Sequence, residues 1–140
     1  MAAELHDKAL YESLLHAKTS IQTAYLERDY ARAIRQIMEL ADRVNQYIDK
    51  YKPWTLVKDP ANMPQVHAIC TTGLHLFCVL MAYLKPVLPE MTKKSETFLN
   101  MEITWDNIDT PRLSHVINSF VPLMRRVERA DVDAMLAAST

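Results

Sequence analysis

The first two regular patterns of apolar residues predict two helices, over residues 4–28 and 30–52. In the first stretch, Leu10, Leu14, Ala17, Ile21 and Ala24 recur at helical spacing with no Gly or Pro between them. Asp29 is placed to cap the second helix, and Pro53 ends it, because the residue before a proline leaves the helical region.

The second predicted helix has one strongly apolar face. At 100° per residue, seven apolar side chains fall within an arc of about 140°. They are Ile34, Ile37, Met38, Ala41, Val44, Ile48 and Tyr51. The opposite side carries the basic residues Arg28, Arg32, Arg35, Arg43 and Lys50. We therefore expect the arc to face a core and the basic side to face solvent.

Further along the chain, residues 54–62 are expected to form a connection and residues 63–84 a third helix. Asn62 and Gln65 resemble a capping box, and Pro64 is tolerated in a first helical turn. The third helix is apolar almost all round, so it is expected at the centre of the fold. Pro86 forces a turn, and Pro89 suits the first position of a fourth helix over residues 89–99.

Residues 100–120 are weakly patterned, so we expect an irregular segment packed over the helices. A last helix is predicted over residues 131–138, capped by Asp131. Since no strand pattern is visible, the fold class predicted is an all-α bundle of four to five helices. A chain of 140 residues forms one domain of ordinary size, residues 1–140.

Composition and charge exclude several classes of protein. With a single Gly, the chain cannot form a glycine-rich phosphate-binding loop. A formal net charge of −1 argues against tight, sequence-blind nucleic-acid binding, although it permits a local basic patch. The longest apolar run, residues 76–84, is far shorter than the ~20 residues of a membrane span. The first residues, MAAELHDK, lack the order of a signal peptide. We expect a cytoplasmic protein without a membrane partner.

The third predicted helix carries four possible metal ligands, which are His67, Cys70, His75 and Cys78. The two His–Cys pairs are separated by about two helical turns, so they cannot converge on one ion without other ligands. Cys70 and Cys78 would lie about 12 Å apart along the axis, beyond disulfide reach. We expect reduced thiols and no metal site, and a free-standing metalloenzyme is the least favoured hypothesis.

No catalytic arrangement stands out. Residues 91–95, MTKKS, resemble the KMSKS loop of class I aminoacyl-tRNA synthetases, but they lie in a predicted amphipathic helix, where a solvated face is favoured. Ser13 and His16 are three residues apart by chance, and nothing orients the neighbours Ser114 and His115. We therefore expect no catalytic residue.

The end of the second predicted helix is the most informative stretch. Trp54 follows the helix end directly, with Lys50, Lys52 and Lys58 nearby. Stacking surfaces beside cations are what unstacked RNA bases need. The alternative is that the indole plugs the end of the bundle, and composition alone favours this plug.

Three motifs occur in a specific order. A helix ends as N-x-Y-x-D, a P-W-x-x-x-K junction follows, and L-K-P-x-x-P comes later. With residues 30–58, 68–70, 76–89 and 97–106, these motifs resemble the α-helical anticodon-binding domain of methionyl-tRNA synthetase in its bacterial form. The resemblance covers nearly the whole chain.

The resemblance implies a bundle attached to a class I catalytic core, which uses ATP and Mg²⁺ to attach methionine to tRNA. The bundle would recognise the CAU anticodon of tRNA(Met), with Trp54 stacking on an anticodon base. Asn45, Tyr47, Asp49, Pro53 and Lys58 match neighbouring positions of the family pattern.

In the RNA-binding surface that the resemblance implies, the residues have distinct roles. Asn45 and Asp49, one turn apart, would pair with base edges or orient a base reader. Lys58, Lys52 and Arg35 would contact phosphates, which position RNA without reading its sequence.

Parts of the family pattern are missing from the chain. They are the catalytic HIGH and KMSKS segments and an upstream helix whose Asn and Arg read anticodon bases. We therefore expect a truncated, monomeric, non-catalytic chain without a cofactor of its own, and a stand-alone paralogue is the alternative. Its expected partners are the tRNA(Met) anticodon loop and the catalytic domain of the same enzyme.

Other interpretations stay open for these residues. Asn45 would be a partly buried, satisfied amide, Asp49 would form an exposed ion pair with Lys52 or Lys50, and Arg35 would be an ordinary solvated residue. The alternative function is a non-catalytic helical protein-interaction module without an RNA role, whose exposed apolar surface would drive association.

Overall fold

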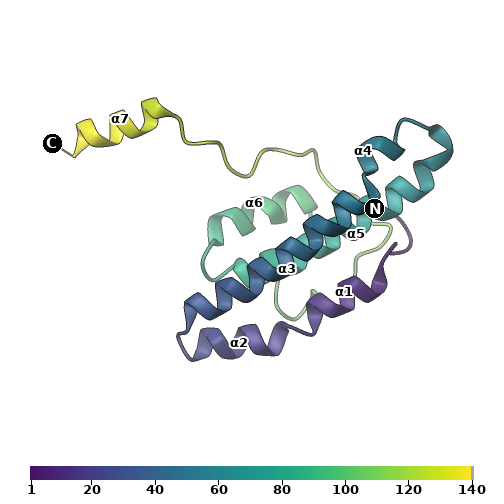
Figure 1. The fold of residues 1–140 in the computed structure, drawn as a ribbon, viewed down its shortest axis with the longest axis horizontal. Coiled ribbons are helices and arrows are strands. Elements are labelled where there is room, and N and C mark those ends of the chain that lie inside the picture. The colour runs from purple at the N-terminus through teal and green to yellow at the C-terminus, as the bar shows by residue number, and fades with distance from the viewer. Residues whose placement is uncertain (140) are drawn as a thin grey trace.

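The computed structural model describes residues 1–139, which form helices and irregular segments without a strand. Five helices make up a bundle: α1 (Lys8–Leu15), α2 (Lys18–Leu26), α3 (Tyr30–Tyr51), α5 (Met63–Leu84) and α6 (Pro89–Leu99). The short α4 (Pro53–Leu56) and the 3₁₀ helix η1 (Pro60–Asn62) connect α3 to α5, and α7 (Arg129–Ala138) projects from the bundle after an extended segment (Figure 1). The prediction of an all-α bundle is confirmed.

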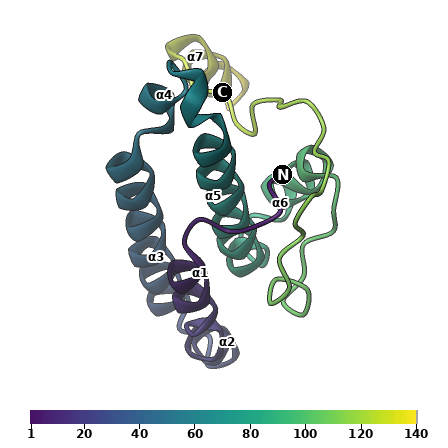
Figure 2. The same cartoon turned by 90° about the vertical axis from the view of Figure 1, so that its right-hand side faces the viewer.

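The third predicted helix is indeed central. As α5, it packs against α1, α3 and α6, while α2 packs against α3 (Figure 2). Its residues Leu76, Val79 and Tyr83 are completely buried. By length and composition, Pro60–Leu84 is also apolar enough to cross a membrane, but 67% of its apolar window is buried inside the bundle.

α3 begins and ends where the sequence predicts. The Asp29 carboxylate accepts the amide of Arg32 at 3.1 Å, and the helix stops at Tyr51, before Pro53. The prediction that Met38 belongs to the core is wrong, because its side chain is 50% exposed. Met38 lies at one edge of the predicted arc, whereas burial extends past the other edge to Tyr47.

The predicted helix over residues 4–28 is split in two. Asp7 caps α1, and at the end of α1 the amide of Ala17 bonds to the Leu14 carbonyl, three residues back, at 3.3 Å. This tighter turn starts α2 in a new direction. Leu14 in α1 and Ile21 in α2 are both fully buried, so the bend keeps both helices against the core.

Three predictions about helix starts and connections need correction. Residues 54–62 are partly helical, as α4 and η1. The Asn62 side chain does not cap α5, because η1 leads directly into that helix. The side-chain amide of Asn62 instead donates to the Leu56 carbonyl. The last helix starts at Arg129, where Glu128 is the N-cap and Asp131 completes a capping box as the third residue.

Residues 100–120 are irregular and pack over the bundle, as predicted. Trp105 contacts Tyr83 with ring centroids 5.0 Å apart. Asn118 donates its side-chain amide to the Thr97 carbonyl at 2.7 Å, and His115 Nε2 lies 2.9 Å from the Leu99 carbonyl. The bond of His115 satisfies a carbonyl that the end of α6 leaves without a helical partner. The bond of Asn118 adds a second donor to the Thr97 carbonyl, which also accepts the amide of Asn100 at 3.3 Å.

Candidate functional site

A sharp corner joins α3 to α4 at one end of the bundle (Figure 1). Lys52 adopts the left-handed conformation, with φ 45° and ψ 62°, and its amide bonds to the Ile48 carbonyl at 2.9 Å. Pro53 then starts α4 with the fixed φ that suits a first helical position. A left-handed non-glycine residue costs about 1 kcal/mol, so the contacts around the corner must hold it in place.

The corner presents Trp54 to solvent. Its side chain is 52% exposed, and it lies outside the cluster of residues that forms the core. Trp105, in contrast, is half-buried and packs against that core. The indole of Trp54 therefore does not plug the bundle in the way the alternative interpretation requires, and much of its surface is free to stack on a ligand.

Asn45 and Asp49 lie one turn apart on the exposed side of α3, within three turns of the corner. Asn45 is exposed, so its interpretation as a partly buried amide is wrong. Among residues 1–139, neither side chain has a hydrogen bond or an ion pair, so the alternative interpretation of Asp49 as the partner of Lys52 or Lys50 is wrong. Lys50 instead lies with Nζ 5.0 Å from the centroid of the Tyr51 ring.

Two lysines flank the indole. Lys52 and Lys58 are exposed, and no ion pair neutralises either of them within the described part of the chain. Arg35 is also exposed, but it lies ten residues before Asn45, about 15 Å away along the helix axis. The structure thus brings Trp54, Pro53, Asn45, Asp49, Lys52 and Lys58 to one end of the bundle and leaves Arg35 apart.

An aromatic cluster beside the corner was missed by the sequence reasoning. His6 Nδ1 lies 3.0 Å from the Tyr47 hydroxyl, and the His6 ring meets the Tyr51 ring edge-on, with centroids 4.5 Å apart. Burial raises the pKa of Tyr47 to about 12, so its phenol stays neutral at physiological pH. Tyr51 belongs to the apolar arc, but no local pattern relates His6 to a residue 45 positions later.

The possible metal ligands of α5 do not converge. His67 and Cys70 are exposed, whereas His75 and Cys78 are buried. Burial lowers the pKa of His75 and raises that of Cys78 to about 12, which keeps both side chains neutral. Within residues 1–139, no group of three His, Cys, Asp or Glu side chains is placed to hold a metal ion.

The MTKKS stretch lies in α6, as predicted. Lys93 and Lys94 are exposed, in agreement with a solvated helix face. Thr92 and Ser95, on the opposite face, are completely buried and bond to carbonyls of the preceding turn. The stretch is therefore part of a packed helix rather than a loop.

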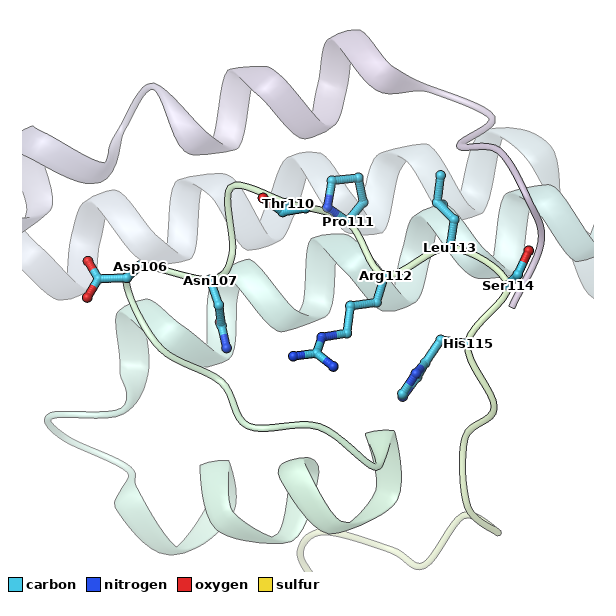
Figure 3. Close-up of a pocket in the computed structure, with 8 residues that line it drawn as sticks. All are labelled: Asp106, Asn107, Thr110, Pro111, Arg112, Leu113, Ser114 and His115. Carbon is cyan, nitrogen blue, oxygen red and sulfur yellow. The ribbon is translucent and has the colours of Figure 1, made fainter.

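The irregular segment of residues 106–115 lines a cavity of about 680 Å³ (Figure 3). Arg112 and His115 point into it, but His115 Nε2 already bonds to the end of α6. Asn107 likewise donates its amide to the Glu102 carbonyl at 2.8 Å. The polar groups that line the cavity thus mainly hold the irregular segment in place, and no residue of the α3–α4 corner lines the cavity.

The arrangement at the corner suits a stacking ligand with negative charge better than a chemical reaction. It offers one exposed indole, two exposed lysines and two polar side chains without partners. Comparison with known families adds no assignment, since no protein family model matches this chain.

Proposed function

We propose that the chain binds RNA at the α3–α4 corner and recognises the CAU anticodon loop of tRNA(Met). The observation that carries the proposal is the half-exposed indole of Trp54 on a fixed turn between two helices. An exposed indole on a fixed turn offers an open aromatic face, and nucleobases stack on such faces in proteins that bind single-stranded nucleic acids.

The proposed mode of binding follows from the positions of the neighbouring side chains. A base splayed out of the loop stacks on Trp54, which is worth about 1–3 kcal/mol by alanine substitution. Asn45 offers both a donor and an acceptor to a base edge, and Asp49 offers acceptors. Lys52 and Lys58 contact phosphates and set the position of the loop. Arg35 is too far along α3 to reach the same nucleotide, so we assign it to the stem side of the RNA.

We further propose that the chain serves methionyl-tRNA synthetase, a cytoplasmic ATP-dependent methionine–tRNA ligase. The support is the resemblance of the motifs N-x-Y-x-D, P-W-x-x-x-K and L-K-P-x-x-P, the first two of which meet at the corner. In this proposal the bundle supplies recognition. ATP, Mg²⁺ and the chemistry belong to a separate catalytic domain, against which the bundle packs.

Binding of a fluorescein-labelled CAU stem-loop, followed by anisotropy, tests the proposal. Trp54→Ala should weaken binding by about 5- to 150-fold, while the far-UV circular dichroism stays unchanged. His67→Ala, another exposed position on the bundle, is the control and should bind like the parent. Equal affinities of the parent and Trp54→Ala would contradict stacking on this indole.

A second candidate function rests on a different surface. The segment before α7 carries apolar side chains that are 64–75% exposed: Val116, Phe120, Val121, Met124 and Val127. Contiguous exposed apolar side chains mark protein-binding surfaces. We propose this segment as the interaction surface of the chain, whether its partner is the catalytic domain or, in a module without an RNA role, another protein. Association through apolar area should persist at high salt, whereas RNA binding should weaken steeply.

A further inference from the structure

The first residues of the chain begin beside α6 and cross over α5 to reach α1 (Figure 2). The amide of Ala2 bonds to the Thr71 hydroxyl at 2.7 Å, and the amide of His6 bonds to the Thr72 hydroxyl at 2.7 Å. Both threonines are buried on α5. The segment is therefore fixed to the central helix, and with it the backbone of His6.

From this fixed position, the His6 ring contacts the last turn of α3. Its Nδ1 lies 3.0 Å from the Tyr47 hydroxyl, and its ring meets Tyr51 edge-on at 80°, with centroids 4.5 Å apart. The two tyrosine rings also contact one another, with centroids 5.1 Å apart. Edge-to-face pairs of this kind stabilise beyond the area that they bury.

The last turn of α3 determines where Trp54 points. Lys52, the next residue, bonds back to the Ile48 carbonyl, and its own carbonyl accepts the amides of Thr55 at 2.8 Å and Leu56 at 3.2 Å. The direction of α4 is thus set by Lys52. Because helix ends fray and a left-handed lysine is strained, this arrangement needs support from outside α3 and α4.

We infer that His6 is a positioning residue for RNA binding, which clamps Tyr47 and Tyr51 and thereby holds the corner that aims Trp54. The inference rests on the proposed function, because His6 can affect RNA binding only through the orientation of the Trp54 indole. It assigns a role in recognition to a residue 48 positions before Trp54 that contacts no nucleotide itself.

A double-mutant cycle with the CAU stem-loop tests this role. His6→Ala should weaken binding several-fold, by less than the loss of about 5- to 150-fold expected for Trp54→Ala. In the Trp54→Ala background, His6→Ala should cause no further loss, because its effect passes through the indole. An undiminished, additive loss in that background would overturn the inference. His67→Ala, an exposed histidine on α5, should leave binding unchanged.

A measurement without RNA separates this inference from the proposed function. In ¹⁵N relaxation, His6→Ala should lower the order parameter of the Trp54 indole N–H, while the Trp105 indole, packed on Tyr83, serves as the internal control. Tyr51→Leu removes the same ring contact and should have the same effect. An unchanged Trp54 order parameter in both variants would overturn the inference. If the order parameter falls but the parent binds no stem-loop, the clamp stands and the RNA-binding proposal fails.

Discussion

Replacing Trp54 with alanine should leave the stability of the bundle almost unchanged, whereas the same replacement at Trp105 should lower it clearly. The two tryptophans have opposite environments. Trp54 is 52% exposed and lies outside the core cluster, while Trp105 packs against Tyr83 and Tyr25, with ring centroids 5.0 Å and 6.3 Å away. The pair therefore distinguishes an indole kept for a ligand from one that holds the fold.

The magnitudes follow from burial. Removing a fully buried tryptophan costs about 3–5 kcal/mol. Because Trp105 is only half-buried, we expect about 2–3 kcal/mol for Trp105→Ala. A substitution at an exposed site usually changes the free energy of unfolding by less than about 0.5 kcal/mol, which is the expectation for Trp54→Ala.

Urea unfolding followed by far-UV circular dichroism measures both effects without using tryptophan fluorescence. With a denaturant slope of about 1–3 kcal/mol per molar, Trp105→Ala should lower the midpoint by roughly 0.7–3 M, and Trp54→Ala by about 0.5 M at most. A Trp54→Ala midpoint as low as that of Trp105→Ala would refute the reasoning and show that the Trp54 indole is a plug of the bundle.

Three further predictions concern the segment over α6 and the dependence of stability on pH. Asn118→Ala should destabilise by about 1 kcal/mol in urea unfolding, because it removes the side-chain hydrogen bond that ties the irregular segment to the Thr97 carbonyl at the end of α6. Burial opposes ionisation of Glu96, but its bonds to the Ile103 amide and to Lys85 prevail and hold its pKa below 4.5. The parent should therefore lose stability as pH falls from 4.5 through the folded-state pKa, and Glu96→Gln should lack this loss in urea midpoints measured against pH. Burial lowers the pKa of His75 below 6.5, so stability should fall as pH drops below 6.5, where the unfolded state binds more protons. His75→Gln should flatten that slope in urea midpoints measured against pH.

Elements with strong local signals were predictable from the sequence. Asp29 and Pro53 bracket α3, and the nearly continuous apolar surface of α5 places it at the centre. The errors occur where contacts between residues far apart in the sequence, or neighbouring elements, determine whether a side chain is buried or caps a helix. Met38 has the right period for the core but no helix covers it, and Asn62 has the right spacing for a cap but η1 precedes it.

The bend that separates α1 from α2 had no sequence signal, since no Gly or Pro marks it. A helix bends there because both halves bury side chains against neighbours that the sequence alone does not locate. The same reason hides the bonds of His115 and Asn118 to α6, because these join residues that lie 16 and 21 positions apart.

For the candidate site, the junction at Trp54 was visible because its residues are close in sequence. The exposure of these residues could not be predicted, since the same sequence is also compatible with a Trp54 side chain that is buried at the end of the bundle. Arg35 was grouped with the others by charge and helix alone, and only the length of α3 separates it from them. His6 was missed because its contacts with Tyr47 and Tyr51 depend on how the first residues cross α5.

Titration of a CAU stem-loop and of a scrambled-anticodon stem-loop, each at low and high salt with tryptophan fluorescence as the signal, tests the central claim most directly. The account predicts quenching by the CAU loop and markedly weaker binding of the scrambled loop. It also predicts a loss of affinity of at least about sevenfold between roughly 50 and 200 mM salt, since the loop phosphate contacts of Lys52 and Lys58 each contribute about −0.7 to the slope of log K and any contact of Arg35 with the stem adds to it. Equal binding of both loops, or binding of neither, would contradict recognition of the anticodon by this chain.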